Sequence, residues 1–229
     1  MLRLAGTGPQ DTVIDLGSGD GRIVIAAAKG FGARGFGVDL DAKLVALSRE
    51  NAKRAGVAGR TEFAVRDALK TDLAQASVVT VYLLPFLIDQ LQPKFLAELK
   101  PGARIVTHAF AMKGWKPDRS ESVALSRPQG GRDSKGDRSE IHLWIVPAQV
   151  RGEWRAAGWR LRIHQNFQEI EIEGEGEGRA LEVKQARLEG ALLHFSGAGF
   201  SFQGRVAADR MTGELTRGGA VAPLAFSRR

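Results

Sequence analysis

Residues 15–22 read Asp-Leu-Gly-Ser-Gly-Asp-Gly-Arg, and their types and spacing suit the binding of a small ligand. An apolar run ending at Val13 and Ile14 precedes them, and residues 23–28 (IVIAAA) follow. This order predicts a strand, a tight glycine turn and the first turns of a helix. Such a turn brings backbone amides and a helix N-terminus close to a ligand.

Three kinds of cofactor use loops of this type, and the residues around the glycines discriminate between them. A P-loop needs a Lys-Ser/Thr pair, whereas this chain has Asp20-Gly21-Arg22. A dinucleotide loop matches Gly17 and Gly19 but needs a third glycine where Arg22 stands, and the Asp20 carboxylate would repel a diphosphate. S-Adenosylmethionine (SAM) has no phosphate and carries a sulfonium and an ammonium group, so carboxylates at the loop favour it.

Further acidic residues are predicted at the ends of the next two strands. Asp39 follows the loop at about the 20-residue spacing of a ribose ligand, and its carboxylate can accept both ribose hydroxyls. Asp67 can accept a hydrogen bond from the adenine amino group, and Ala68 leaves room for the ring. The predicted cofactor-binding residues are Asp15, Gly17, Ser18, Gly19, Asp20, Gly21, Asp39, Leu40, Asp67 and Ala68.

Structural alternatives remain open for several of these residues. A glycine turn also serves as an ordinary α/β connection, Asp20 suits a helix N-terminus, and Asp67 suits a polar strand end. Asp41 is predicted to be a helix N-cap and not a ligand. The agreement of the loop with two acidic strand ends favours the cofactor site.

The elements that position these residues alternate along the first half of the chain. Strands are predicted at 12–16, 34–40, 61–66, 78–84 and 103–108, with helices at 21–29, 41–56 and 86–100. This alternation predicts a doubly wound, mostly parallel α/β sheet that binds ligands beyond the carboxyl ends of its strands. Residues 123–125 and 141–146 are predicted as two last strands of this sheet, joined by a basic, glycine-containing loop at 127–138.

From residue 151 onward, short segments such as WRLRIHQNF and FSFQGRV alternate apolar and polar residues between glycines. This pattern predicts a meander of antiparallel strands, as in a small sandwich or half-barrel. We therefore expect two domains, a cofactor-binding domain at 1–147 and a small all-β extension at 151–229, whose role the sequence leaves open.

The composition of the 229 residues is that of an ordinary globular protein, with 43% hydrophobic and 26% charged residues. Without cysteine there is no disulfide or thiolate metal site, and the four scattered histidines lack metal spacing, so no metal is predicted. The net charge of +7 is not gathered into a nucleic-acid-binding stripe. No membrane span or export signal is visible, and the default expectation is a cytoplasmic location, with a lost upstream export segment left open. The sequence predicts no oligomeric state.

The motifs DLGSGDGR at 15–22 and GVDLD at 37–41 resemble those of class I (Rossmann-type, seven-strand) SAM-dependent methyltransferases. More narrowly, LVALSRENAKRAG, VYLLPFLIDQLQPKFLAELKPGARIV and GWKPDR are similar to small protein-lysine methyltransferases related to the mitochondrial ones, over about residues 2–147. The resemblance implies that Asp39 holds the ribose of SAM and Asp67 the adenine region, whereas the methionine part is held by Asp15, Gly17, Ser18, Gly19 and Asp20. It also implies transfer of the methyl group to an acceptor, above all a protein lysine amine. A small-molecule acceptor and a non-catalytic SAM-binding module are the alternatives.

Two departures from this family stand out. Its members usually carry a Y-V-P-T/S-like segment upstream of the glycine loop, and we expect that segment to be missing here, since Met1 stands just before Asp11. The β-rich extension at 151–229 has no counterpart in the mitochondrial relatives and is similar to extensions of bacterial ones, which indicates a bacterial source.

The acceptor wall is predicted from residues 82–85 (YLLP), which close the fourth strand. Tyr82, the sole tyrosine, is the candidate catalytic residue, orienting an amine through its hydroxyl, with a packed aromatic ring as the alternative. The stretch lacks the N/D-P-P-Y/F motif of an adenine or cytosine methyltransferase. His108 is expected to line the cleft or bond a backbone group and not to act as a base, and no catalytic dyad is expected.

Overall fold

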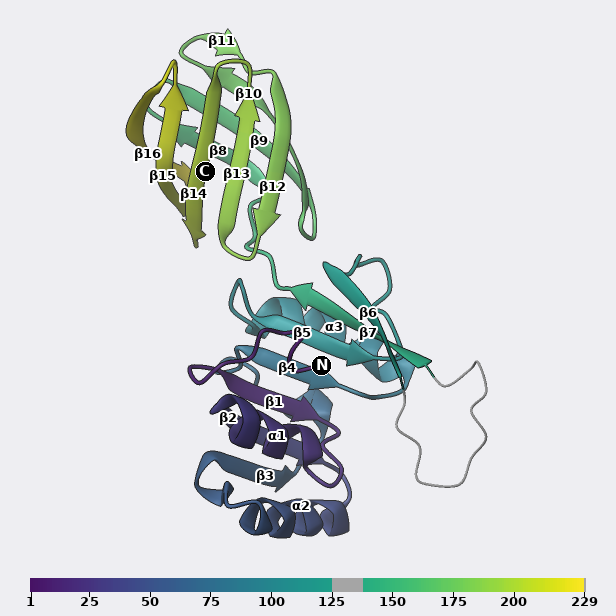
Figure 1. The fold of residues 1–229 in the computed structure, drawn as a ribbon. Helices are drawn as coiled ribbons and strands as arrows, with labels where there is room; N and C mark the ends of the chain where they lie inside the picture. The colour runs from purple at the N-terminus through teal and green to yellow at the C-terminus, as the bar shows by residue number, and fades with distance from the viewer. Residues whose placement is uncertain (125–137, 229) are drawn as a thin grey trace. The chain divides into compact units, whose positions relative to one another are not determined.

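The computed structural model describes residues 1–124 and 138–228, which form two compact units, Met1–Ile145 and Val146–Arg229 (Figure 1). Most of the basic loop expected at 127–138 lies outside the described residues, as does Leu125 of the strand expected at 123–125. Each unit is described by itself below.

In the described part of the first unit, seven strands form one sheet in the order β3-β2-β1-β4-β5-β7-β6. The strands β1 to β5 run parallel to one another, and β7 runs antiparallel to both β5 and β6. This confirms the mostly parallel α/β sheet. The strands are β1 (Thr12–Leu16), β2 (Arg34–Asp39), β3 (Thr61–Val65), β4 (Val78–Val81), β5 (Arg104–His108), β6 (Arg119–Ala124) and β7 (Arg138–Ile145).

Three α-helices follow β1, β2 and β4 in the described residues: α1 (Arg22–Phe31), α2 (Ala42–Arg54) and α3 (Pro85–Glu98). Two short 3₁₀ turns, η1 (Ala58–Arg60) and η2 (Ala68–Lys70), flank β3. Asp41 caps α2 by accepting the Lys43 amide at 2.7 Å, as expected. Val24 of α1, Val45 and Ala52 of α2 and Phe63 of β3 form one buried cluster, which fixes the helices that follow the glycine loop and Asp39.

The fourth strand is shorter than the sequence predicted, because β4 ends at Val81 and not at Leu84. The apolar character of residues 82–84 has a different cause. Leu84 takes the N-cap position of α3, and Pro85, whose fixed φ suits the first turn of a helix, begins it. Tyr82 and Leu83 therefore form a short connection at the carboxyl edge of the sheet.

The second unit is one antiparallel sheet in the order β11-β10-β9-β8-β16-β15-β14-β13-β12. Its alternation is plain in β9, where Trp159, Leu161 and Ile163 are buried while Arg160 and Arg162 are exposed. The curled sheet encloses its own core and confirms the antiparallel meander. The strands are β8 (Gly152–Ala156), β9 (Trp159–Asn166), β10 (Glu169–Gly176), β11 (Arg179–Ala180), β12 (Val183–Glu189), β13 (Leu192–Gly197), β14 (Phe200–Ala207), β15 (Arg210–Arg217) and β16 (Ala220–Arg228).

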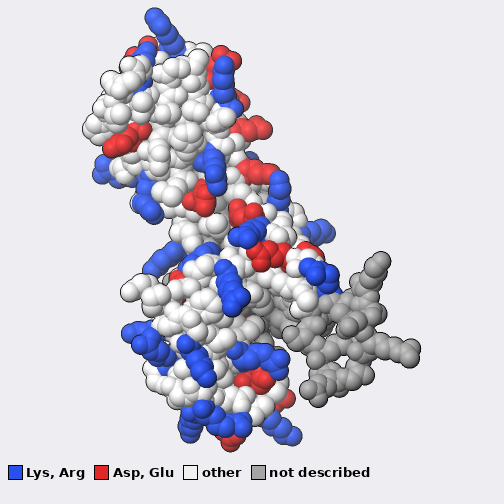
Figure 2. All heavy atoms as spheres, in the orientation of Figure 1, with Lys and Arg blue, Asp and Glu red and all other residues white. Residues whose placement is uncertain are grey.

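Charged side chains are spread over the surface of each unit. Figure 2 shows Lys and Arg scattered among Asp, Glu and uncharged residues on one face of the molecule. In the second unit some of them pair across neighbouring strands, as Arg160 does with Glu175 at 3.1 Å and Arg162 with Glu153 at 2.8 Å. Exposed pairs of this kind contribute little to stability, so charge alone does not mark a functional surface on this face.

Candidate cofactor site

The glycine turn between β1 and α1 is tied to the end of β2. The amides of Gly17 and Ser18 both donate to the Val38 carbonyl oxygen at 2.9 Å. Gly17, Gly19 and Gly21 all have positive φ, at 80°, 53° and 81°, which disfavours side chains at these positions. Their surroundings differ, because a Cβ at Gly17 would lie 2.7 Å from Leu83, whereas a Cβ at Gly19 would meet no atom within 4 Å. The space beside Gly17 is therefore filled by the Leu83 side chain, whereas the space beside Gly19 is open.

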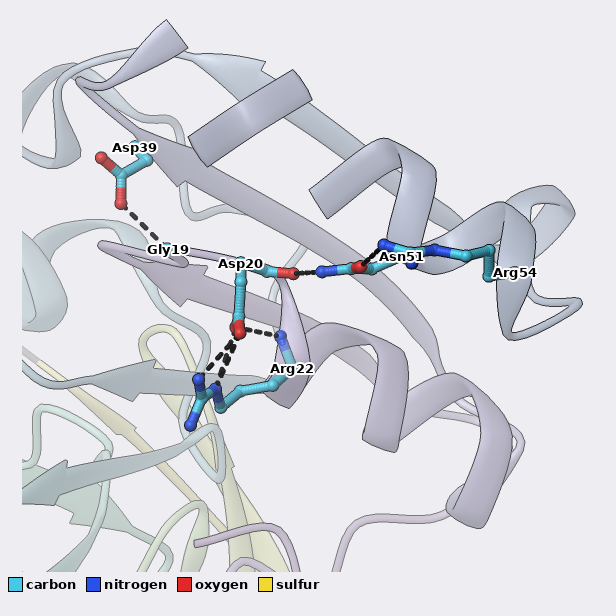
Figure 3. A network of polar contacts seen from close by, with 6 residues as sticks. All are labelled: Gly19, Asp20, Arg22, Asp39, Asn51 and Arg54. Carbon is cyan, nitrogen blue, oxygen red and sulfur yellow. Dashed lines mark hydrogen bonds and ion pairs between the residues drawn. The ribbon is translucent and has the colours of Figure 1, made fainter. Parts of the chain in front are cut away.

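Asp39 joins this turn to the start of α2. One carboxylate oxygen accepts the Gly19 amide at 2.9 Å, and the other accepts the Asp41 amide at 3.0 Å. Figure 3 shows the first of these bonds spanning the turn. Each carboxylate oxygen can accept a further hydrogen bond. The geometry thus leaves Asp39 able to bind hydroxyl donors, and its ribose contact stays a prediction.

Asp15 lies beneath the turn and is only 2% exposed. Its carboxylate accepts a hydrogen bond from the Thr80 hydroxyl at 2.6 Å. Burial raises the pKa of Asp15 to about 7 against the opposing effect of Thr80, and the charges of Asp39 and Asp20 raise it further. No Lys or Arg forms an ion pair with Asp15 among the described residues. A cationic ligand would supply the missing positive charge.

Asp20 is engaged in a way that sequence reasoning missed. Its carboxylate accepts three hydrogen bonds from the Arg22 guanidinium, at 2.9 and 3.2 Å from Nε and at 2.8 Å from Nη2, as Figure 3 shows. The hydrogen bond with Arg22 lowers the pKa of Asp20. The side chain of Arg22 is 82% exposed, so this is a surface ion pair of small stabilising effect. The Asn51 side chain fixes the Asp20 backbone by donating to its carbonyl oxygen at 2.9 Å.

The remaining predicted residues have mixed surroundings. Ser18 is buried with its side chain against Gly37, so its hydroxyl points into the sheet and not toward the open side at Gly19. Asp67 lies beyond the end of β3 and caps η2 by accepting the Leu69 amide at 2.9 Å, a cap that the sequence did not predict, and its adenine contact stays a prediction. Ala68 is the first residue of η2.

Large apolar side chains are exposed at the same carboxyl edge of the sheet. Leu40 follows β2 and Val65 is the last residue of β3, whereas Tyr82, Leu84, Phe86 and Phe110 follow β4 and β5. The last four are called the acceptor rim below. Exposed apolar groups that gather at one edge mark a ligand-binding surface. The Tyr82 ring packs against His108 with ring centroids 4.3 Å apart, a pairing that the sequence did not reveal.

A depression of about 670 Å³ lies at the opposite, amino edge of the sheet, next to Pro9, Arg34 and Arg60. None of the predicted cofactor residues lines it, so its size alone does not make it the cofactor site.

Within residues 1–124 and 138–228 there is no group of three or more His, Cys, Asp or Glu side chains arranged to hold a metal. No helix of the described chain has the length and apolar character needed to cross a membrane.

The site fits a positively charged adenosyl ligand. Asp15 offers a buried carboxylate whose ionised form a cationic ligand would stabilise, Asp39 offers hydroxyl acceptors, and the open side of Gly19 leaves room at the backbone. The Arg22 guanidinium is already paired with Asp20. The carboxylates of Asp20 and Asp39 at the turn would repel a diphosphate.

Comparison with known proteins agrees with this assignment. Residues 15–119 match the ANTKMT methyltransferase domain. A protein-lysine N-methyltransferase of Saccharolobus islandicus is 40% identical over 51% of this chain and 73% of its own length. The adenine nucleotide translocase lysine N-methyltransferase of mouse is 39% identical over 46% of this chain, which spans only about half (46%) of that relative.

A crystal structure of an RNA methyltransferase from Salinibacter ruber, in complex with S-adenosyl-L-homocysteine, is 42% identical. It covers 65% of this chain and 89% of its own, with a TM-score of 0.57. The S-adenosyl-L-homocysteine bound in that protein agrees with SAM as the cofactor here. The chain belongs to the ANTKMT-type family of SAM-dependent methyltransferases.

Proposed function

We propose that the chain transfers the methyl group of SAM to the ε-amino group of a lysine in a protein. The observation that carries this proposal is the acceptor rim, which places apolar surface beside a loop lined with carboxylates. A lysine has an apolar four-carbon stem and a cationic head, so it matches both features. The names of the archaeal and mouse relatives support the same acceptor.

The residues of this chain have three tasks in such a reaction. Asp15 balances the positive charge of the cofactor, and Asp39, which is held by the Gly19 amide, accepts the hydroxyl groups of the cofactor. Leu84 and Phe86 pack on the lysine stem and exclude water, which lowers the pKa of the amine and favours its reactive neutral form. SAM supplies an electrophilic methyl group on a good leaving group, so proximity and alignment provide most of the rate enhancement.

RNA is the second candidate acceptor, because the Salinibacter protein of known structure is called an RNA methyltransferase. The net charge of +7 is compatible with RNA, but the residues that follow β4 are Tyr82-Leu83-Leu84-Pro85. They lack the N/D-P-P-Y/F motif expected for a nucleobase methyltransferase. The lysine acceptor therefore remains the better supported of the two.

The acceptor is tested with methyl-labelled SAM and a heat-treated bacterial lysate, in which endogenous methyltransferases are inactive. Parallel samples receive ribonuclease or protease before the labelled material is separated, and labelled protein is hydrolysed to amino acids. We expect protease-sensitive label that is recovered as N-methyl-lysine. Ribonuclease-sensitive label, or label only in small molecules, would overturn the lysine proposal. Binding of SAM without any transfer would indicate a binding module.

Two variants accompany this assay. Asp39→Ala is expected to abolish both SAM binding and transfer, because it removes the acceptor of the Gly19 and Asp41 amides. Asp209→Ala is the matched control, since Asp209 is exposed in the second unit and outside the proposed site. Equal loss in both variants would point to a general defect and not to the cofactor site.

A further inference from the structure

Tyr82 and His108 come together because β4 and β5 are adjacent parallel strands in a defined register. Val81 pairs with Thr107, and Tyr82 and His108 are the residues that follow this pair along the chain. Their rings are 4.3 Å apart between centroids and inclined by 51°. Leu16 pairs with Val81 on the other side, which puts Gly17 at the same level. With strands about 4.8 Å apart, His108 lies about 10 Å from the strand end where the glycine turn begins.

The backbone around His108 is held in an unusual conformation. Ala109, which follows it, has a φ of 69°, a left-handed conformation that residues with a Cβ disfavour. The Ala109 amide donates to the Glu140 carbonyl oxygen at 2.8 Å, and the Thr107 hydroxyl donates to the Phe110 carbonyl oxygen. A strained backbone conformation that hydrogen bonds hold in place on both sides is typical of functional positions. It fixes the direction in which His108 leaves the sheet.

The imidazole of His108 is available to an incoming ligand. Among the described residues it makes a ring contact with Tyr82 and no hydrogen bond or ion pair. Burial lowers the pKa of His108, and the charge of the Met1 amino group lowers it further. The other titratable groups on the strands beside it are the Tyr82 hydroxyl and, on β7, Glu140 and His142, the last of which is engaged with Ser120 at 2.8 Å. The free imidazole is therefore neutral at neutral pH.

Contrary to the expectation from the sequence, we propose that His108 is the general base that removes a proton from the acceptor lysine, and that the Tyr82 ring holds the lysine ammonium group before this step. The inference rests on the proposed function and deepens it. The exposed face of Tyr82, 58% of whose surface is accessible, attracts a cationic amine. The neighbouring imidazole nitrogen then accepts one ammonium proton, which converts the lysine to a neutral amine and His108 to imidazolium.

The bonds and protons of the methyl transfer balance with the amine, the cofactor and His108 alone. The lone pair of the neutral amine forms the new N–C bond, while the C–S bond of the cofactor breaks and its electron pair goes to sulfur. The product is a methylammonium, and His108 returns its proton to water through its exposed edge. The apolar acceptor rim and the neighbouring sulfonium both lower the pKa of the amine, which brings it closer to that of an imidazole.

The test is the pH dependence of methyl-lysine formation by wild-type protein and by His108→Asn, using excess heat-treated lysate protein as acceptor. Asparagine keeps a hydrogen-bond acceptor but cannot take a proton. We expect the wild-type rate to be nearly constant between about pH 7 and about pH 9, because His108 is neutral and the lysine is charged in this range. The variant rate should be lower by about 100-fold at neutral pH and should rise about tenfold per pH unit.

Three further measurements separate catalysis from a structural defect. His108→Asn should bind S-adenosylhomocysteine as tightly as wild type in calorimetry, and added imidazole should partly restore the rate of His108→Ala. The His108 ring should titrate below pH 6.5 in NMR spectra of the wild-type protein. His164→Asn, a substitution of an exposed histidine in the second unit, is the matched control and should change none of these properties.

Two outcomes overturn the inference in distinguishable ways. If wild-type protein forms no methyl-lysine, the proposed function fails and the inference fails with it. If wild-type protein forms methyl-lysine and His108→Asn follows a parallel pH profile, the proposed function stands and His108 is not the base.

Discussion

The buried carboxylate of Asp15 should destabilise the ligand-free protein at alkaline pH. Its pKa is raised from 3.8 to about 7, mainly by burial, and a shift of about 3 units corresponds to about 4 kcal/mol. Since the folded-state pKa lies above the unfolded value, the native state keeps a proton that the unfolded chain has lost between about pH 4 and about pH 7. Stability therefore falls as the pH rises through this window, and the whole cost is present above it.

Asp15→Asn removes this cost, because an amide does not ionise and its oxygen can still accept the Thr80 hydroxyl. At about pH 8 we expect the ligand-free variant to be more stable than wild type by up to about 4 kcal/mol, and at about pH 4 nearly equal to it. The effect of Asp15→Asn on the affinity for SAM should be opposite to its effect on stability. The wild-type affinity should increase with pH up to about 7 as Asp15 ionises, whereas the variant should bind weakly at every pH.

The measurement is unfolding of the full chain by calorimetry across this pH range, with the transition of the first unit assigned by its response to SAM. Asp11→Asn provides a control in which the change in the free energy of unfolding has the opposite sign. Although burial acts to raise the pKa of Asp11, the Ser77 hydroxyl, the Gly8 amide and Arg104 together lower it. That variant should be destabilised near neutral pH, with a difference that shrinks in acid. A loss of stability in Asp15→Asn at about pH 8, or a pH-independent effect, would refute the electrostatic reasoning.

Three further predictions concern the loop and the acceptor rim. Asp39→Asn should weaken SAM binding by about 10- to 100-fold in calorimetry, and an unchanged affinity would contradict the charge-assisted contact. Phe86→Ser should raise the KM for the protein acceptor and leave the SAM affinity unchanged, so a loss of both would exclude a specific acceptor role. Gly21→Ala should lower the free energy of unfolding by about 2–3 kcal/mol, since the added Cβ would lie 2.8 Å from the Phe63 ring and from Ser48. Arg22→Ala should lower it by less than about 1 kcal/mol, because it removes only an exposed ion pair.

Much of the parallel sheet could be predicted because its signals are local. Apolar runs and glycine turns indicate the strands β1 to β5, and Asp41 indicates where α2 begins. The glycine loop and Asp39 could also be placed at one edge, because the carboxyl ends of parallel strands meet there. The ion pair of Asp20 with Arg22 was not foreseen, although the two residues are only two positions apart.

Features that depend on strand register could not be read from the sequence. The contact of Tyr82 with His108 joins residues 26 positions apart and exists because Val81 pairs with Thr107. Pattern reasoning extended the fourth strand to residue 84, which concealed that Tyr82 follows its last paired residue. A signal was nevertheless present, since both residues lie near the carboxyl ends of predicted strands, at the edge where the cofactor is expected to bind.

The central claim is that carboxylates around the glycine turn select a cationic cofactor over diphosphates. Calorimetric titration of the ligand-free chain with SAM, NAD and ATP under identical conditions tests it most directly. The account predicts saturable binding of one SAM per chain, lost in Asp39→Ala, and no heat of binding for NAD or ATP. Tight binding of either diphosphate-containing nucleotide, with no binding of SAM, would contradict it.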